Sequence, residues 1–240
     1  MIKPEAAYCD PTTGLCTPSP IEGSDEPISY REDVEIIYVG DPMCSWCWGI
    51  SPALNQLQNA AEVNSIPYRL VMGGLRPGGG DPWNEEFRSF LKHHWEEVNA
   101  RSGQPFGMEL FKRESFNYDT EPACRSVVAA RQLVPESESR FFELVQHRFY
   151  VLNEDPNKLG FYEPICEDLN IDFDQFSVLF ESEATKAATL RDFQISRQMG
   201  ISGFPTVVFR KEDQFIAIAR GYSEFDSMWS AVTSLMEGEN

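Results

Sequence analysis

Two cysteines separated by two residues, Cys44 and Cys47 in the string Cys-Ser-Trp-Cys, are the residues of this chain best suited to covalent chemistry. Two thiols at this spacing can form and break a disulfide reversibly, because one sulfur attacks as a thiolate and the other resolves the mixed disulfide. The other cysteines are Cys9, Cys16, Cys124 and Cys166. The motif therefore predicts redox chemistry, with Cys44 as the nucleophile and Cys47 as the resolving thiol.

A zinc half-site and a buried pair of packing cysteines are the alternatives to redox chemistry. A closed zinc site needs four ligands, which usually come from a second C-x-x-C motif or from closely spaced histidines. The chain has neither, since its histidines are the adjacent His93 and His94 and the distant His147. Free cysteines are often buried as small apolar residues, so packing stays open. We favour redox chemistry and expect no metal and no cofactor.

The residues around the motif predict a strand, a turn and a helix. Residues 34–39 are β-branched and aromatic, which favours a buried strand, and Gly40-Asp41-Pro42 favours a turn. Apolar residues then recur at helical spacing from residue 50 through residue 62. Cys44 is therefore expected where a helix begins, and there unpaired N–H groups and the helix dipole favour a thiolate. Cys47, one turn later, is expected to be shielded.

A proline far along the chain completes the predicted site. Pro205, in Gly203-Phe204-Pro205-Thr206, stands directly before a β-branched run, and a residue without an N–H belongs at the start of a strand. Together with the C-x-x-C motif this pattern resembles the thioredoxin superfamily, in which a cis-proline opening a strand faces the cysteines. The resemblance implies that Pro205 is the cis-proline and that Phe204 presents backbone groups to a substrate peptide. An ordinary trans proline is the alternative.

The distance between Cys47 and Pro205 indicates a large insertion. Between them lie 157 residues, whereas a minimal thioredoxin domain has a few dozen. Segments with apolar residues at helical spacing fill most of this stretch, at 83–100, 121–133, 137–152, 159–169 and 172–181. This layout resembles the DsbA-like family, α/β proteins in which a helical domain interrupts the thioredoxin fold.

Three shorter strings are similar to the bacterial DsbA-type group of predicted protein-disulfide isomerases. They are residues 41–49, the glycine-rich residues 73–79 and residues 119–124. Pro52 also stands eight residues after Cys44, where thioredoxin-like active-site helices commonly carry a kinking proline. The implied organisation is an extension at 1–33, a thioredoxin-like domain at 34–74 and 184–240, and a helical insertion domain at 75–183.

Trp46 and its neighbour Ser45 set the expected character of the site. Trp46 is the aromatic side chain expected to line a peptide groove, whereas Trp48 can equally be a residue that packs the helix against the rest of the protein. The Ser45-Trp46 pair has no charge and no histidine, so the helix N-terminus must supply most of the stabilisation of a thiolate. We therefore expect a reductase or disulfide isomerase rather than a strong oxidant.

The remaining cysteines fall into two groups. Cys9 and Cys16 lie in a segment rich in Pro, Gly, Ser and acidic residues, with turn signals between them, so their thiols can approach closely enough to bridge. They are either an auxiliary redox pair that exchanges with Cys44–Cys47, a passive tail, or zinc ligands shared with the motif. Cys124 and Cys166 stand among apolar residues at helical spacing and are expected to pack in the core.

Composition limits the partners. The net charge of −18, with only 20 Lys and Arg, argues against nucleic acid and anionic membranes, which need a basic face. No run of eighteen apolar residues occurs, and residues 1–8 lack the apolar core of a secretory signal, so we expect a cytoplasmic protein. The expected partners are protein or peptide thiols and disulfides, with glutathione as a further candidate.

Two other functional classes stay open. The kappa-like branch of glutathione transferases and chromene-carboxylate isomerases shares the DsbA-like fold but typically uses a single Ser or Cys, so the presence of both Cys44 and Cys47 weighs against it. A non-enzymatic binding protein that uses the cysteines as a redox sensor is the other alternative.

Overall fold

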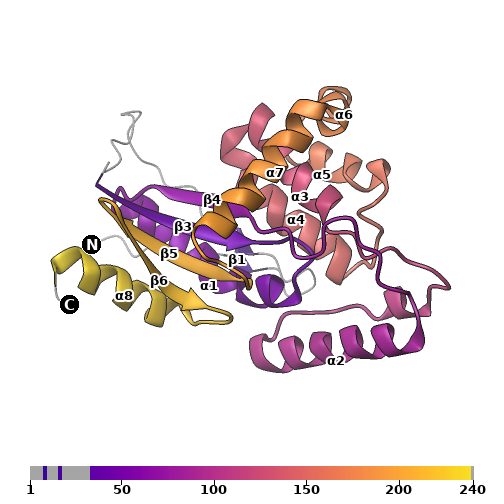
Figure 1. The fold of residues 1–240 in the computed structure, drawn as a ribbon, viewed down its shortest axis with the longest axis horizontal. Helices are drawn as coiled ribbons and strands as arrows, with labels where there is room; N and C mark the ends of the chain where they lie inside the picture. The colour runs from indigo at the N-terminus through magenta and orange to yellow at the C-terminus, as the bar shows by residue number, and fades with distance from the viewer. Residues whose placement is uncertain (1–7, 10–15, 18–32, 239–240) are drawn as a thin grey trace.

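A four-stranded sheet lies at the centre of the computed structural model, which describes residues 8–9, 16–17 and 33–238. The strand order is β4-β3-β5-β6, with β3 parallel to β4 and the other pairs antiparallel. Figure 1 shows α7 on one face of the sheet and α1 and α8 on the other. The bounds are β3 (Val34–Gly40), α1 (Ser45–Val63), β4 (Tyr68–Met72), α7 (Glu183–Gln198), β5 (Thr206–Lys211), β6 (Gln214–Arg220) and α8 (Phe225–Glu237).

A group of helices between β4 and α7 forms the insertion that the sequence predicts. They are α2 (Glu85–Ser102), α3 (Glu121–Leu133), α4 (Glu138–Tyr150), α5 (Glu163–Asp168) and α6 (Phe173–Glu181). The expected helix at 159–169 is instead a 3₁₀ turn at Leu159–Phe161 followed by the short α5, because Pro164 lacks the N–H that would continue a single helix. The predicted fold class, an α/β thioredoxin fold interrupted by a helical insertion, is confirmed. No helix in the described residues has the length and apolar character that a bilayer crossing requires.

The side chains of β3 alternate between two cores. Ile36 and Tyr38 belong to the large core that the sheet shares with α1 and the insertion. Ile37 and Val39 belong to a smaller core on the opposite face, completed by residues in and next to α7. Because successive strand residues point to opposite faces, Tyr38 is directed to the side on which the C-x-x-C helix lies.

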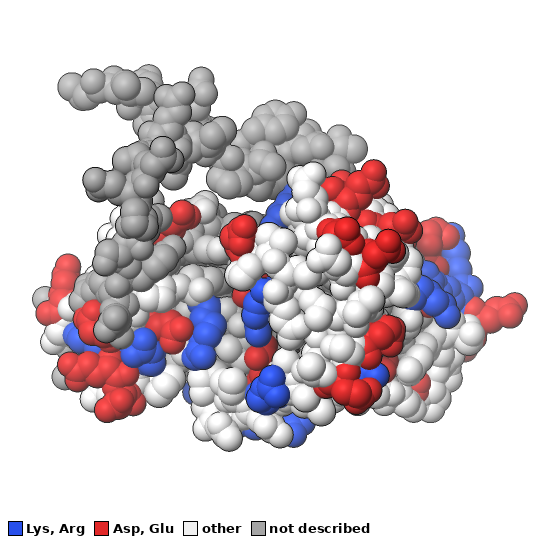
Figure 2. All heavy atoms as spheres, turned by 90° about the horizontal axis from the view of Figure 1, so that it is seen from above, with Lys and Arg blue, Asp and Glu red and all other residues white. Residues whose placement is uncertain are grey.

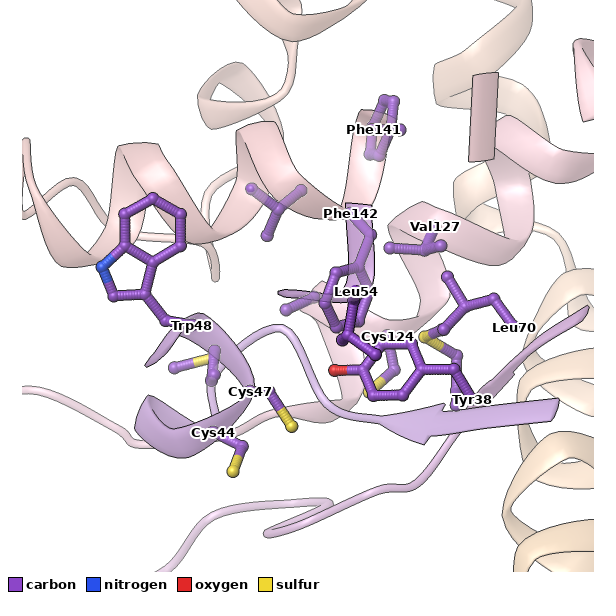
Figure 3. Close-up of a cluster of buried hydrophobic side chains, with 14 of the residues drawn as sticks. Tyr38, Cys44, Cys47, Trp48, Leu54, Leu70, Cys124, Val127, Phe141 and Phe142 are labelled. Carbon is purple, nitrogen blue, oxygen red and sulfur yellow. The ribbon is translucent and has the colours of Figure 1, made fainter. Parts of the chain in front are cut away.

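Gly40 allows the Tyr38 ring to lie along the strand. The two residues share a face of the sheet, and a Cβ atom at Gly40 would overlap the hydroxyl end of the Tyr38 ring. Phe142 of α4 packs edge-on against this ring, with the ring centroids 5.8 Å apart. The Tyr38 hydroxyl consequently reaches the beginning of α1 (Figure 3).

Pro52 lies inside α1 and cannot donate the usual hydrogen bond to the Trp48 carbonyl one turn earlier. That carbonyl instead accepts hydrogen bonds from Ser51 Oγ at 2.9 Å and from Gln104 Nε2 at 3.1 Å. Gln104, which follows α2, also donates to Ser51 Oγ at 2.8 Å. Gln104 of the insertion therefore replaces the backbone donor that α1 lacks at Pro52.

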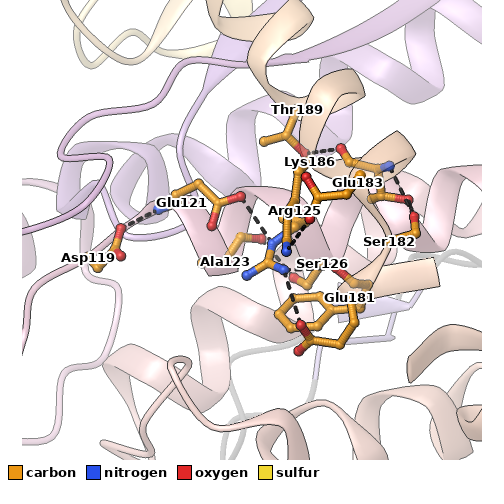
Figure 4. A network of polar contacts seen from close by, with 12 residues as sticks. Asp119, Glu121, Ala123, Arg125, Ser126, Glu181, Ser182, Glu183, Lys186 and Thr189 are labelled. Atoms are coloured by element: carbon orange, nitrogen blue, oxygen red, sulfur yellow. Dashed lines mark hydrogen bonds and ion pairs between the residues drawn. The ribbon is translucent and has the colours of Figure 1, made fainter. Parts of the chain in front are cut away.

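Arg125 on α3 joins helices of the insertion to one another (Figure 4). Its guanidinium pairs with Glu121 at 3.0 Å and donates to the Phe180 carbonyl at 2.9 Å. The guanidinium carbon lies 4.1 Å from the centroid of the Phe180 ring. A cation that is removed from water needs such partners, so this cluster holds α3 against α6 in one arrangement.

Arg131 and Asp192 attach the insertion to the outer edge of β4. Asp192 of α7 accepts from the Arg131 guanidinium at 2.9 Å and from the Met72 N–H at 3.1 Å. Arg131 also donates to the Leu70 carbonyl at 3.0 Å. An edge strand otherwise leaves such groups open to pairing with another chain, so these contacts both close the edge and fix α7 on the sheet.

We expect Gln104→Leu to lower the free energy of unfolding by about 1–3 kcal/mol, because the buried Trp48 carbonyl and Ser51 hydroxyl lose a donor. Urea unfolding measures this loss. In a Pro52→Ala background the loss should be smaller, since the backbone N–H restored at position 52 offers another donor. Equal losses in the two backgrounds would show that Gln104 does not compensate for the proline.

Candidate active site

Cys44 occupies the N-cap position of α1, with extended backbone angles of φ −90° and ψ 116°. Its carbonyl accepts hydrogen bonds from the N–H groups of Cys47 at 2.9 Å and Trp48 at 3.1 Å, and its own N–H donates to the Asp41 carbonyl at 3.0 Å. Its side chain forms no capping hydrogen bond. The Cys44 sulfur therefore lies at the helix end where free N–H groups and the dipole favour negative charge.

The fold brings Phe204 and Pro205 to Cys44. Their peptide bond is cis, and β5 begins directly after Pro205. Thr206 of β5 pairs with Val39 of β3, so β5 starts beside the end of the strand that leads into α1. The Cys44 thiol donates to the Phe204 carbonyl with an Sγ to O distance of 3.5 Å. Residues that are far apart in the sequence thus form one site.

Cys47 lies one turn into α1 and is fully buried, so it is shielded as expected. Burial raises the pKa of the Cys47 thiol well above its usual value, and charge on Cys44 raises it further. The Tyr38 hydroxyl, which points towards Cys47 in Figure 3, lowers the pKa of Cys47. Cys47 therefore stays protonated until Cys44 has reacted, which suits a resolving thiol.

Asp41 is a polar residue of the site that the sequence analysis treats only as part of a turn. Its buried carboxylate accepts hydrogen bonds from the N–H groups of Met43 at 2.8 Å and Leu75 at 2.6 Å, and from the Cys124 thiol at 3.4 Å. Burial raises the pKa of the Asp41 carboxyl, and the two N–H bonds lower it. The carboxylate joins the turn before Cys44 to the loop after β4 and to α3. An acid between a strand and a C-x-x-C helix is the sequence signal that could have identified it.

Tyr118 supports the same turn from the helical insertion. Its hydroxyl donates to the Met43 carbonyl at 2.7 Å, and burial raises the pKa of Tyr118 so that the hydroxyl keeps its proton. Nearby residues of the insertion hold the glycine-rich loop, since Thr120 accepts from the Arg76 N–H at 3.0 Å and Asp119 from the Gly78 N–H at 2.7 Å. The loop N–H groups are thereby committed to protein partners.

The two predicted substrate-contact residues each pack against a neighbouring residue and stay half-buried. Trp46 is half-buried and packs edge-to-face against Tyr222, with ring centroids 6.3 Å apart. The half-buried Phe204 ring lies over Gly73, where a Cβ atom would overlap it. A hollow of about 260 Å³, lined by α1, α2 and the start of α8, includes Tyr222 in its wall. In contrast to Trp46, Trp48 is buried and donates to the Pro105 carbonyl at 3.0 Å.

Cys9 and Cys16, the predicted auxiliary redox pair, lie in the short strands β1 (Tyr8–Cys9) and β2 (Cys16–Thr17). These strands pair antiparallel with Cys9 directly opposite Cys16. Directly opposite residues of an antiparallel pair have Cα atoms roughly 4.5–5.5 Å apart, which falls in the range for a disulfide. Residues 10–15 between them lie outside the described residues. Exchange between this pair and Cys44 stays a prediction, and so does zinc binding by the four thiols.

The expected core positions of Cys124 and Cys166 are confirmed, since both are fully buried. Burial raises the pKa of both thiols, and for Cys124 the charge of Asp41 raises it further. Neither belongs to the predicted redox pair, but the hydrogen bond to Asp41 links Cys124 to the site. Among the residues that the structure describes, no group of three or more His, Cys, Asp or Glu side chains is arranged to hold a metal ion.

Comparison with known proteins decides the family. A family model described as thioredoxin matches residues 37–226, a range that contains the two cysteines of the motif and Pro205. The chain belongs to the thioredoxin family. Within this family its helical insertion makes it DsbA-like, as the resemblance implies.

Solved structures with the same DsbA-like architecture come from several bacteria. A provisionally assigned protein disulfide isomerase from Nitrosomonas europaea is 34% identical, with a TM-score of 0.80 over 87% of this chain and 100% of that chain. The cytosolic disulfide reductase DsbM of Pseudomonas aeruginosa is 23% identical, with a TM-score of 0.68 over 85% of this chain and 99% of that chain. The similarity to DsbM supports the DsbA-like thioredoxin fold alone.

Curated relatives carry a different name. The ClpXP adapter protein SpxH of Bacillus subtilis is 21% identical over 80% of this thioredoxin-family chain, and its counterpart from Shouchella clausii is 21% identical over 85%. This chain spans 64% and 66% of the length of those two proteins, respectively.

We expect Asp41→Ala to lower the free energy of unfolding of this DsbA-like chain by about 2–4 kcal/mol, because two buried N–H groups lose their acceptor. Urea unfolding measures the loss. Asp41→Asn is the matched control, since it has the same shape and keeps one acceptor oxygen, and it should lose less. Equal losses for the two variants would contradict the role given to the carboxylate oxygens.

Proposed function

We propose that this chain is a thiol–disulfide oxidoreductase that reduces or isomerises disulfides of proteins and peptides. The observation that carries the proposal is the juxtaposition of Cys44 at a helix N-terminus with the Phe204 carbonyl, 3.5 Å from its sulfur, next to the cis bond to Pro205. The description of the Nitrosomonas europaea relative as a disulfide isomerase supports the same class.

In the first step the Cys44 thiolate attacks one sulfur of a substrate disulfide. A bond forms between Cys44 Sγ and that sulfur, the substrate S–S bond breaks, and the departing substrate thiolate takes a proton. The N-terminus of α1 stabilises the attacking thiolate. A backbone N–H of the substrate can replace the Cys44 thiol as the donor to the Phe204 carbonyl, which would hold the peptide across the site.

In the second step Cys47 loses its proton and attacks Cys44 Sγ. The new Cys44–Cys47 bond replaces the mixed disulfide, and the second substrate sulfur leaves as a thiolate that is protonated. The protein dithiol is oxidised by two electrons and the substrate disulfide is reduced by two. In isomerisation a second thiol of the substrate, instead of Cys47, displaces Cys44 and restores it.

The environment of Cys44 favours reduction or isomerisation over net oxidation. Ser45 and Trp46 carry no charge, so the thiolate depends mainly on the helix end. A less stabilised thiolate makes the dithiol a better reductant, because a strong oxidant owes its potential to a highly stabilised reduced form. We also propose a cytoplasmic location, where thiols are kept reduced.

The proposed substrates are extended segments with accessible disulfides, and glutathione is a smaller candidate with the same thiol chemistry. Trp46 and Phe204 supply apolar surface beside Cys44, and the neighbouring hollow of about 260 Å³ offers room for a substrate side chain. Figure 2 shows one face of the molecule on which basic side chains occur in small groups between acidic ones. A polyanion such as nucleic acid has no continuous basic surface to bind there.

We expect Cys44→Ser to abolish reduction of insulin by dithiothreitol-recycled protein, because the attacking sulfur is gone. Cys47→Ser should instead accumulate a mixed disulfide between Cys44 and the substrate, visible by mass spectrometry. Cys166→Ser is the matched control, since this buried thiol lies in α5 outside the site, and it should retain turnover. Insulin reduction that persists in Cys44→Ser would refute the assignment.

A redox-sensing adapter is the second candidate, and the names of the curated relatives favour it. In this function the surface around Trp46 and Phe204 binds a partner protein, and the Cys44–Cys47 pair changes its affinity. Binding retained in a Cys44→Ser/Cys47→Ser double variant that has no disulfide turnover would support the adapter. Turnover in the unmodified chain, with no partner bound in either redox state, would remove it.

A further inference from the structure

A small cavity borders Cys47 between the sheet and the helical insertion. Its volume is about 20 Å³, which is room for one water molecule. Its walls come from β3, α1, β4 and α4, and they include Tyr38, Cys47 and Gln146. At its rim lie Asn55 and Gln58, which are half-buried, so the cavity leads from the resolving thiol towards the surface.

Two buried side chains lining this cavity have polar atoms with no nitrogen or oxygen partner in the part of the protein that the structure describes. They are the Tyr38 hydroxyl, whose polar neighbour is the Cys47 sulfur, and both polar atoms of the Gln146 amide. Tyr38 is 3% exposed and Gln146 is 0% exposed. An unpaired buried polar group costs roughly 1–3 kcal/mol, whereas a buried water with two to four polar neighbours removes that cost. The lining therefore suits one bound water better than an apolar void.

The second step of the proposed mechanism requires Cys47 to lose its proton. Cys47 is a buried thiol that must ionise before it attacks Cys44, and burial raises its pKa. Tyr38 is a suitable donor to the resulting thiolate, because burial raises the pKa of Tyr38 and keeps its hydroxyl protonated. Phe142 packs against the Tyr38 ring, and Gly40 leaves room for the ring because it has no side chain. The Tyr38 hydroxyl therefore points towards Cys47.

We propose that Tyr38, Gln146 and one water molecule between them form the proton exit of Cys47 during resolution of the mixed disulfide. This inference rests on the proposed function. The Cys47 proton passes to the water, which is hydrogen-bonded to the Gln146 amide. At the same time Tyr38 donates a hydrogen bond to the Cys47 sulfur. The electron pair on Cys47 forms the bond to Cys44 Sγ, and the departing substrate sulfur takes a proton from solvent. The cavity water relays the Cys47 proton past the rim to a base in the bulk solvent.

Other titratable groups around Cys47 bear on its pH dependence. Cys44 lies on the same helix, and its negative charge raises the pKa of Cys47 in the free dithiol but is absent from the mixed disulfide. Tyr68 of β4 and Glu143 of α4 line the cavity. The Glu143 carboxylate is engaged by Asn55 Nδ2 at 3.1 Å and by Arg140 Nη1 at 2.6 Å. Of these cavity groups, Tyr38 is the one whose side chain interacts with the Cys47 sulfur.

The two steps can be timed separately with the chromogenic aryl disulfide DTNB. The reference is the full chain with Cys9→Ser and Cys16→Ser, so that the buried Cys124 and Cys166 are the only thiols besides the pair. Attack by Cys44 releases one coloured thiolate, and attack by Cys47 on the mixed disulfide releases a second. We expect Tyr38→Phe to leave the first release unchanged and to slow the second by about tenfold at neutral pH, as for loss of one hydrogen bond to an ionised group.

The pH profile gives a readout that a merely structural role would not move. Removing a donor to the thiolate disfavours ionisation of Cys47, so the midpoint of the second phase should move to higher pH in Tyr38→Phe. Gln146→Leu should slow the same phase in the same direction. Tyr162→Phe is the matched control, because its buried hydroxyl donates to the Pro156 carbonyl inside the insertion, and both phases should match the reference.

The inference is overturned if the second phase of Tyr38→Phe equals that of the reference at every pH, or if both phases slow together. Should Tyr38→Phe not unfold cooperatively, Gln146→Leu decides: a slowed second phase supports the exit, and an unchanged one overturns it. Failure of the proposed function is a different result, in which the reference itself releases only one thiolate and forms no Cys44–Cys47 disulfide.

Discussion

The turn between β3 and α1 is the constraint on which the rest of the structure depends. Within a few residues the chain leaves a buried strand and begins a buried helix, and each backbone group on the way needs a partner. Asp41 supplies acceptors from its backbone and from its side chain. Its carbonyl accepts a hydrogen bond from the Cys44 N–H, and its carboxylate accepts from the N–H groups of Met43 and Leu75. The result is a helix N-terminus held against β5, where a thiolate and a substrate backbone can be stabilised together.

The helical insertion contributes to the chemistry because it completes the rear of the site. Gln104 supplies the hydrogen bond that Pro52 withholds from α1, and Tyr118 supports the turn before Cys44. Gln146 lines the cavity beside Cys47. The resolving thiol is therefore enclosed by the sheet on one side and the insertion on the other, in surroundings that neither part provides alone.

Much of the site was predictable from sequence because the signals are local. A β-branched run, a turn and helical periodicity locate Cys44 at a helix start, and a proline before a second β-branched run locates Pro205. The contacts of Asp41, Tyr38 and Gln146 were not predictable, because each depends on how distant elements pack. The sequence predicts Tyr38 only as a strand residue. That its ring lies over Gly40 follows only from the folded structure. Residues 159–169 show the same limit, because helical periodicity continues across Pro164, whereas the structure has a 3₁₀ turn followed by the short α5.

The redox state of the pair tests the central claim most directly. The full chain would be equilibrated in glutathione buffers from strongly reducing to oxidising, acid-quenched and alkylated, and its disulfides assigned by peptide mass spectrometry. The account predicts a Cys44–Cys47 disulfide that appears and disappears with the buffer in a single two-electron transition. Cys44 and Cys47 that remain thiols across the whole range, while other cysteines of the chain oxidise, would contradict it.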